Sequence, residues 1–117
     1  MISSGNTINL EDFRAKDTKS GIISKVFTGR DKGEIVRKQS RIDEIEEKYD
    51  VVNVVIPENI YSINPSFFEE LFVNVVTKLG KDKFLEKFKF VYQGYNFGDK
   101  LMESIDRILR DNNALDN

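Results

Sequence analysis

The sequence of 117 residues contains no cysteine and no histidine. These two absences exclude disulfides, cysteine nucleophiles, zinc sites built from cysteine and histidine, Ser-His-Asp triads and catalysis by imidazole. No hydrolase of the common types can be built from such a chain. The absence of cysteine is typical of a reducing compartment, so we expect a cytoplasmic protein.

Tryptophan is also absent, and the longest apolar runs are far too short to span a bilayer. The first residues have neither the basic region nor the long apolar run of a signal peptide. With 18 basic and 20 acidic residues the net charge is −2, which gives no general attraction to nucleic acid or to an anionic membrane. We therefore expect a soluble intracellular protein that binds neither.

The residues that are present suffice for one core. The chain is 39% hydrophobic and 11% aromatic, with nine phenylalanines, and a chain of this length buries roughly two-thirds of its unfolded surface. We predict a single domain over residues 1–117, with its core at about 7–110 and a frayed tail at 111–117.

Four segments have the pattern of strands. Alternating polar and apolar residues predict a half-exposed edge strand over 7–13, and residues 22–27 predict either a second short strand or a strand-to-helix transition. The run of β-branched residues at 51–56 predicts a central strand with both faces covered. Residues 89–92 predict the last strand.

Three further segments have the pattern of helices, at 31–49, at 82–87 and from Asn96 to about residue 110. In the first, basic residues precede acidic ones, which is opposite to the preference of the helix dipole. Its apolar positions, which share one helical face, are Ile35, Val36, Ile42, Ile45 and Tyr49.

The helix at 65–79 has the strongest local signals. Asn64 is a favourable N-cap, Pro65 suits the first helical position, and Gly80 stops the helix. Because this helix follows an apolar strand, its N-terminus with its free amides is expected at a sheet edge, where α/β domains commonly meet their partners.

Two motifs in this region resemble a known family. The run SINPSFFEELF at 62–72, followed by LGKDKF at 79–84, resembles the STAS-like family of uncharacterised bacterial and phage proteins, named after sulphate transporters and anti-sigma-factor antagonists. The resemblance implies an α/β fold with a mixed central sheet of about four strands and helices packed on it. It also implies a protein partner, for example a kinase-like ATPase.

The chain departs from that family at two places. Ile56-Pro57 stands where members often have Asp-Phe, and Pro65 stands where anti-sigma-factor antagonists have the phosphorylated serine. Ser66 and Ser62 are the phosphoacceptors that remain near this surface.

We predict that the segment 57–72 docks a partner, and its candidate partner-binding residues are Asn64, Ser66, Glu69 and Glu70. The two glutamates point about 100° apart on a helix, so we interpret them as surface residues and not as a catalytic pair. Thr28 and Arg30, at another helix start, are candidate anion contacts, although a solvated loop without P-loop spacing is favoured there. We interpret a group of lysines as a solvated basic face: Lys78, Lys81, Lys83, Lys87 and Lys89.

These observations favour a non-enzymatic, regulatory protein–protein interaction module without catalytic, cofactor or metal-binding residues. One alternative is a phage or mobile-element protein that inhibits a host factor. Others are a nucleotide- or anion-binding module, and a small enzyme without histidine or cysteine, which a cleft joining Arg30, Glu69 and either Tyr92 or Tyr95 would favour. The exposed edge strand allows a homo-oligomer.

Overall fold

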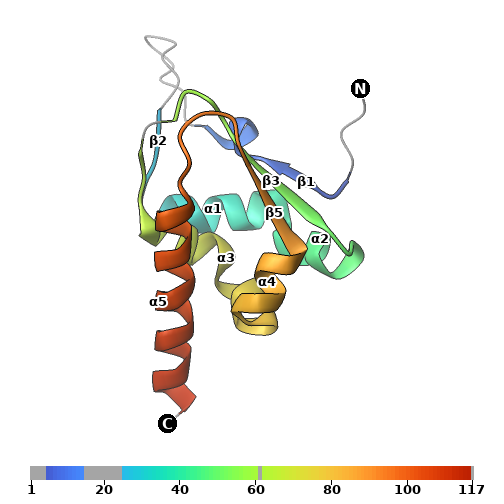
Figure 1. Cartoon of the computed structure of the whole chain (residues 1–117), viewed down its shortest axis with the longest axis vertical. Coiled ribbons are helices and arrows are strands. Elements are labelled where there is room, and N and C mark those ends of the chain that lie inside the picture. Colours follow the sequence, from blue (N-terminus) through green and yellow to red (C-terminus); the bar gives the residue numbers. More distant parts are fainter. Residues whose placement is uncertain (1–4, 15–24, 61, 117) are drawn as a thin grey trace.

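The computed structural model describes residues 5–14, 25–60 and 62–116, the last five of these by their backbone alone. They form an α/β fold that measures 49 × 31 × 24 Å (Figure 1). The elements in chain order are β1 (Thr7–Asn9), a 3-10 helix η1 (Leu10–Phe13), β2 (Val26–Phe27), α1 (Arg30–Ser40), α2 (Ile42–Lys48), β3 (Val52–Ile56), β4 (Ser62–Ile63), α3 (Pro65–Leu79), α4 (Lys81–Lys87), β5 (Phe88–Tyr92) and α5 (Gly98–Asp116).

The strands form two small parallel sheets. One has the order β1-β3-β5, and the other consists of β2 and β4 alone. The predicted edge strand and central strand are confirmed as β1 and β3. The prediction of one mixed sheet of about four strands is wrong for the described residues, because β2 pairs with β4 instead of joining β3. Of the predicted strand at 22–27, residues 22–24 lie outside the described ranges.

The first strand ends earlier than predicted. Asn9 accepts a hydrogen bond from the amide of Glu11 at 3.0 Å, and the chain turns there into η1. The predicted strand over 7–13 is therefore a strand only as far as Asn9.

The predicted helix at 31–49 is two helices. Arg41 adopts a left-handed conformation with φ 58°, which separates α1 from α2. The break explains the unusual charge order, because each shorter helix has acidic residues in its first turn and basic residues in its last, as its dipole prefers. Within α1, Val36 is fully buried whereas its neighbour Ile35, which was expected on the same apolar face, is 46% exposed, because adjacent helical residues point about 100° apart.

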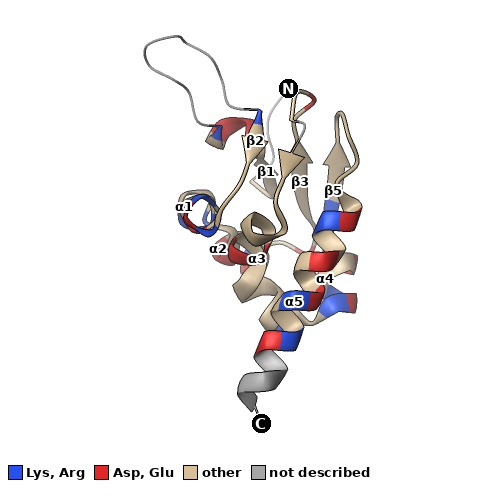
Figure 2. Ribbon diagram, turned by 90° about the vertical axis from the view of Figure 1, so that its left-hand side faces the viewer, with Lys and Arg blue, Asp and Glu red and all other residues tan. Residues whose placement is uncertain are grey.

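Helix α3 lies at the centre, with α1 and α5 packed against it (Figures 1 and 2). It begins after Asn64 and ends at Gly80 as predicted. The ring of Phe72 contacts the rings of four other phenylalanines, so the core is built from aromatic packing as the composition suggests. These four are Phe68, Phe84, Phe88 and Phe90. The last helix continues to Asp116, whereas the sequence pattern predicts that it ends at about residue 110.

The close approach of α1 to α3 requires a glycine. A Cβ atom on Gly33 would lie 2.5 Å from the carbonyl oxygen of Phe67 and 2.8 Å from the Cβ of Glu70. Ordinary contacts are well above these distances, so no larger residue fits here without a shift of one helix. This spacing sets the distance between the charged side chains of α1 and α3.

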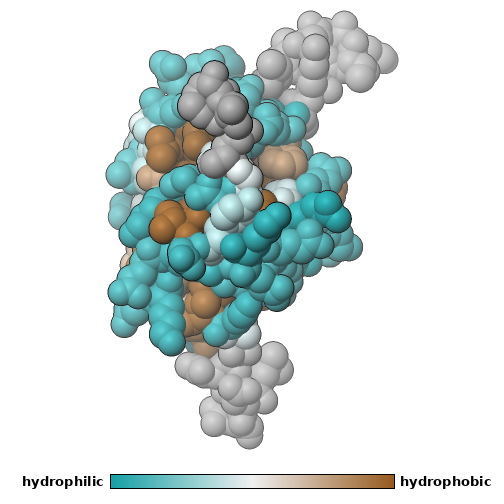
Figure 3. All heavy atoms as spheres, turned by 90° about the vertical axis from the view of Figure 1, so that its right-hand side faces the viewer, coloured by the Kyte–Doolittle hydropathy of each residue, from teal (hydrophilic) through white to brown (hydrophobic). Residues whose placement is uncertain are grey.

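The charged residues lie mainly on the helices, and β1 and β3 carry none (Figure 2). On the face shown in Figure 3, hydrophobic residues form separate patches surrounded by hydrophilic ones. Among the described residues, no helix combines the length and the apolar character needed to cross a membrane.

Candidate functional site

Two strand-to-helix junctions lie side by side. In the parallel pair of β2 and β4, Phe27 lies opposite Ile63, and the amide of Asn64 donates a hydrogen bond to the carbonyl oxygen of Phe27 at 3.1 Å. Each strand then leads directly into a helix, β2 into α1 and β4 into α3. The register therefore brings the predicted anion-contact segment next to the predicted docking segment.

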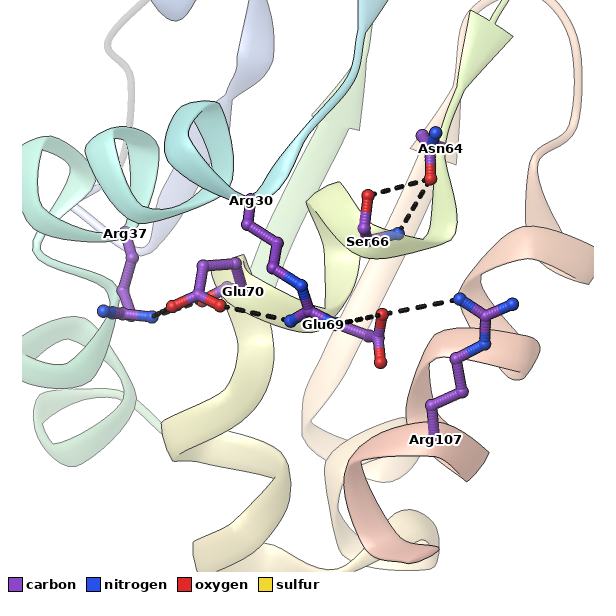
Figure 4. Close-up of polar contacts among 7 residues, drawn as sticks. All are labelled: Arg30, Arg37, Asn64, Ser66, Glu69, Glu70 and Arg107. Carbon is purple, nitrogen blue, oxygen red and sulfur yellow. Dashed lines mark hydrogen bonds and ion pairs between the residues drawn. The ribbon is translucent and has the colours of Figure 1, made fainter. Parts of the chain in front are cut away.

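At the α3 junction the cap is formed as predicted. The side-chain oxygen of Asn64 accepts hydrogen bonds from the amide of Ser66 at 3.0 Å and from its hydroxyl at 2.9 Å (Figure 4). Asn64 is exposed, whereas Ser66 and Ser62 are half-buried. The Ser66 hydroxyl is thus engaged in the cap, and phosphorylation of either serine stays a prediction.

At the α1 junction, Thr28 is exposed and Arg30 reaches away from the helix start toward α3 (Figure 4). The side chain of Arg30 is 61% exposed, with guanidinium nitrogens 3.5 Å from Glu69 Oε2 and 3.6 Å from Glu70 Oε2. Two carboxylates therefore already face this guanidinium. The prediction that Thr28 and Arg30 contact an anion stays untested.

Glu69 is only 5% exposed, so the interpretation of this residue as a surface residue is wrong. Helix α5 packs beside α3 and places Arg107 Nη1 3.6 Å from Glu69 Oε2, on the opposite side from Arg30. Both ion-pair distances exceed hydrogen-bond length, and the buried Oε2 atom receives no hydrogen bond from the described residues. The guanidiniums offset its charge, but its capacity to accept a hydrogen bond is unused.

Glu70 is held more tightly. Its Oε1 atom lies 3.1 Å from Arg37 Nη1, and the same guanidinium nitrogen donates to the backbone carbonyl of Glu70. Although Glu69 and Glu70 diverge on the helix, Arg30 lies between them and contacts both. The result is a network of ion pairs across α1, α3 and α5 (Figure 4).

A pocket of about 140 Å³ opens beside this network. Its lining consists of Arg30, Glu69, Glu70, Val73, Thr77, Ile108 and Asp111. Arg30 and Glu69 therefore do share a pocket, but neither Tyr92 nor Tyr95 belongs to its lining, so the cleft that would favour an enzyme is not formed by these residues. We refer to this cavity as the α3–α5 pocket.

The predicted basic face on the other end of α3 is partly neutralised. Lys78 and Lys87 donate hydrogen bonds to the two oxygens of the buried Glu46 carboxylate, at 2.7 and 2.8 Å. Lys81 lies 3.3 Å from Asp106. Although they are paired, Lys78 and Lys81 have side chains that are 53% and 39% exposed, so the interpretation of a solvated face is confirmed for them and is wrong for Lys87, whose side chain is 20% exposed.

Opposing effects act on Glu46. Burial by itself raises the pKa of the Glu46 carboxyl, but the hydrogen bonds and positive charges of Lys78 and Lys87 together outweigh burial and hold this pKa below its ordinary value. The Glu46 carboxylate in turn raises the pKa of Lys78. These shifts favour the charged forms, so this cluster serves to join α2, α3 and α4.

Arg37, Arg107 and Glu46 belong to the ion-pair networks but are not marked as functional residues by the sequence. Each becomes significant only through a partner more than 30 residues away, and no local pattern marks such a residue. Within the described part of the chain, no group of three or more acidic residues is arranged to hold a metal ion.

No family model, curated protein or solved structure matches this chain. The resemblance to the STAS-like family therefore stays a prediction based on residues 62–84.

Proposed function

We propose that this protein is a non-enzymatic regulatory interaction module that docks a protein partner on one surface. We call it the junction surface and define it by Thr28, Arg30, Asn64, Ser66 and Glu70; the predicted partner-binding residue Glu69 is buried and is not part of it. The observation that carries the proposal is the β2–β4 register, which places two helix starts side by side.

The composition of the junction surface suits recognition of a polar partner. Thr28, Arg30 and Asn64 are exposed, and the side chain of Arg30 is 61% exposed although its guanidinium lies near two glutamates. Arginine is enriched among the residues that dominate binding energies, partly because its planar guanidinium forms several directed hydrogen bonds. Because so much of the guanidinium side chain is exposed, a partner carboxylate can pair with it while Arg30 keeps its contacts with Glu69 and Glu70.

The surface is also held rigidly. Asn64 and Ser66 are fixed by the cap, and Glu70 is fixed by Arg37. Binding then costs less conformational entropy than it would on a loose loop. The STAS-like resemblance supports a kinase-like ATPase as the kind of partner, and a host factor is the alternative.

Photocrosslinking tests the proposal. A benzoyl-phenylalanine at position 28 samples the junction surface, because Thr28 is exposed. The matched control carries the same group at position 91, since Val91 is 46% exposed on β5, outside this surface. We expect a specific adduct in native host lysate from position 28 and none from position 91. Equal labelling from both positions, or none from position 28, would count against the junction surface.

A further inference from the structure

Strand β5 forms one edge of the three-stranded sheet. Figure 2 shows it at the end of the sheet, after β3. Among the described residues, no other strand pairs with its far side. The strand is five residues long, whereas β1, the edge strand from which the sequence allows a homo-oligomer, has three. An exposed edge strand offers unpaired backbone groups to a strand of another chain.

The backbone groups that point to the open edge belong to Phe90 and Tyr92. The amide of Gln93 donates a hydrogen bond to the carbonyl oxygen of Ile56 on β3 at 3.0 Å. In a parallel pair only every second residue of an edge strand bonds to its neighbour, so the odd-numbered residues of β5 face β3. The N–H and C=O groups of Phe90 and Tyr92 therefore face outward.

The side chains along this edge follow a pattern that is the same in both directions. The sequence from Lys89 to Gln93 is KFVYQ, which reads polar, aromatic, β-branched, aromatic and polar. When two copies run antiparallel with their Val91 residues opposite each other, Phe90 lies opposite Tyr92 of the second copy. Lys89 lies opposite Gln93 of the second copy. Aromatic and β-branched cross-strand pairs stabilise antiparallel sheets, and no like charges meet in this register.

The backbone agrees with this register. In an antiparallel sheet, the two residues of a hydrogen-bonded pair exchange both of their backbone bonds, and Phe90 and Tyr92 both face outward as such a pair requires. Val91 then forms the closer, non-hydrogen-bonded pair with its own copy. A register centred on Phe90 would need the amide of Phe88 as a donor to Tyr92, but this amide already donates to the carbonyl oxygen of Phe84 at the end of α4.

The same register extends an apolar row across the sheet. Val91 is 46% exposed and lies beside the half-buried Val55 of β3. Pairing about Val91 brings the Val55–Val91 pairs of both copies into one row. Neighbouring side chains in this row cover apolar surface that an isolated edge leaves in water.

We propose that two copies of this chain associate through β5, antiparallel about a two-fold axis at Val91, so that their three-stranded sheets join into one. The occupant is a second copy because like residue types meet when this edge pairs with itself, as an isologous contact requires. A five-residue strand gives a small interface, so we expect a weak dimer with a dissociation constant on the order of 0.1 mM. This proposal does not depend on the proposed function, since no residue of β5 belongs to the junction surface.

Sedimentation velocity and amide hydrogen exchange test the dimer on the purified full chain. Between about 10 µM and about 1 mM protein, we expect the mass to rise from that of one chain toward that of two. The amides of Phe90 and Tyr92 should become protected over the same range, whereas the amide of Gln93, which is bonded within one chain, should be protected throughout. A monomer at every concentration, or association that leaves Phe90 and Tyr92 unprotected, would overturn the proposal.

The variant Val91→Lys tests the two-fold contact. It places two lysines directly opposite each other, and like charges in this position are destabilising. Because Val91 is 46% exposed, we expect a folded protein that stays monomeric at the concentrations where wild type dimerises. Val51→Lys is the control, since it makes the same change at a 41% exposed position just before β3 and should dimerise like wild type. Wild-type dimerisation of Val91→Lys would contradict the two-fold contact.

Two variants of Gln93 test the register. Each places its new charge opposite Lys89 of the second copy, and symmetry makes this contact twice. We expect Gln93→Glu to tighten the dimer by about threefold to tenfold and Gln93→Lys to weaken it by a similar factor. Within one chain the two positions are about 13 Å apart along the strand, too far for direct contact. Equal affinities for the two variants would show that the register is wrong.

The weak dimer leaves the crosslinking control valid. At about 1 µM protein in the lysate, the concentration is far below the expected dissociation constant, so position 91 stays unpaired there. Failure of the dimer experiments is therefore distinct from failure of the crosslinking experiment, which tests only the junction surface.

Discussion

The contact between α1 and α3 is tested most simply by Gly33→Ala. In an ordinary exposed helix, this change stabilises by about 1 kcal/mol because alanine has the higher helix propensity. Here the new methyl would lie 2.5 Å from the carbonyl oxygen of Phe67, which α3 holds in place. Overpacking of this kind costs about 1–3 kcal/mol, and a clash with backbone places the cost in the upper part of that range. We therefore expect a net loss of about 1–2 kcal/mol.

Urea denaturation followed by circular dichroism measures this loss. With a slope of about 2 kcal/mol per molar urea, the midpoint should fall by about 0.5–1 M. Gln39→Ala, at an exposed position of the same helix, is the control and should leave the midpoint nearly unchanged. A Gly33→Ala protein more stable than wild type would refute the close helix contact, and with it the geometry of the Arg30 and Arg37 ion pairs.

Two further predictions concern the cap and the buried charge cluster. Asn64→Ala removes the acceptor of both Ser66 hydrogen bonds and should lower the unfolding free energy by about 1 kcal/mol; an unchanged urea midpoint would contradict the cap. The folded-state pKa of Glu46 is lowered, so its contribution to stability is present above the unfolded pKa and is lost as pH falls through the folded pKa. The difference in urea midpoint between wild type and Glu46→Gln should therefore shrink from pH 7 toward about pH 3. The control Glu86→Gln, at an exposed position, should have nearly the wild-type midpoint at both pH values. A Glu46→Gln difference that stays constant with pH would contradict the lowered pKa of Glu46.

The elements predicted correctly are those with signals in consecutive residues. Asn64, Pro65 and Gly80 mark both ends of α3, and the β-branched run marks β3. Capping groups and strand composition act over a few residues, so the sequence alone is sufficient to locate these elements.

The break at Arg41 had no such signal. A left-handed residue is normally marked by glycine, and here an arginine adopts this conformation. The reversed charge order of the segment was a sign of two helices, because it conflicts with the dipole of one helix but agrees with the dipoles of two.

The candidate site could be predicted only in part. Asn64, Ser66, Arg30 and the glutamate pair were identified from local patterns, yet their grouping depends on the β2–β4 pairing and on the packing of α5. The burial of Glu69 has the same origin, since two adjacent acidic residues look solvent-facing until distant arginines are placed beside them. Tertiary contacts of this kind leave no mark in a window of neighbouring residues.

The central claim is that a protein partner docks on the junction surface, and the most direct test is the affinity of the partner captured through position 28. Isothermal titration compares wild type with Arg30→Ala and with Lys38→Ala, whose lysine is more exposed and lies on the same helix. We predict that Arg30→Ala weakens binding by about tenfold or more, as for a residue that dominates an interface, and that Lys38→Ala binds like wild type. Equal affinities for all three proteins would contradict the claim.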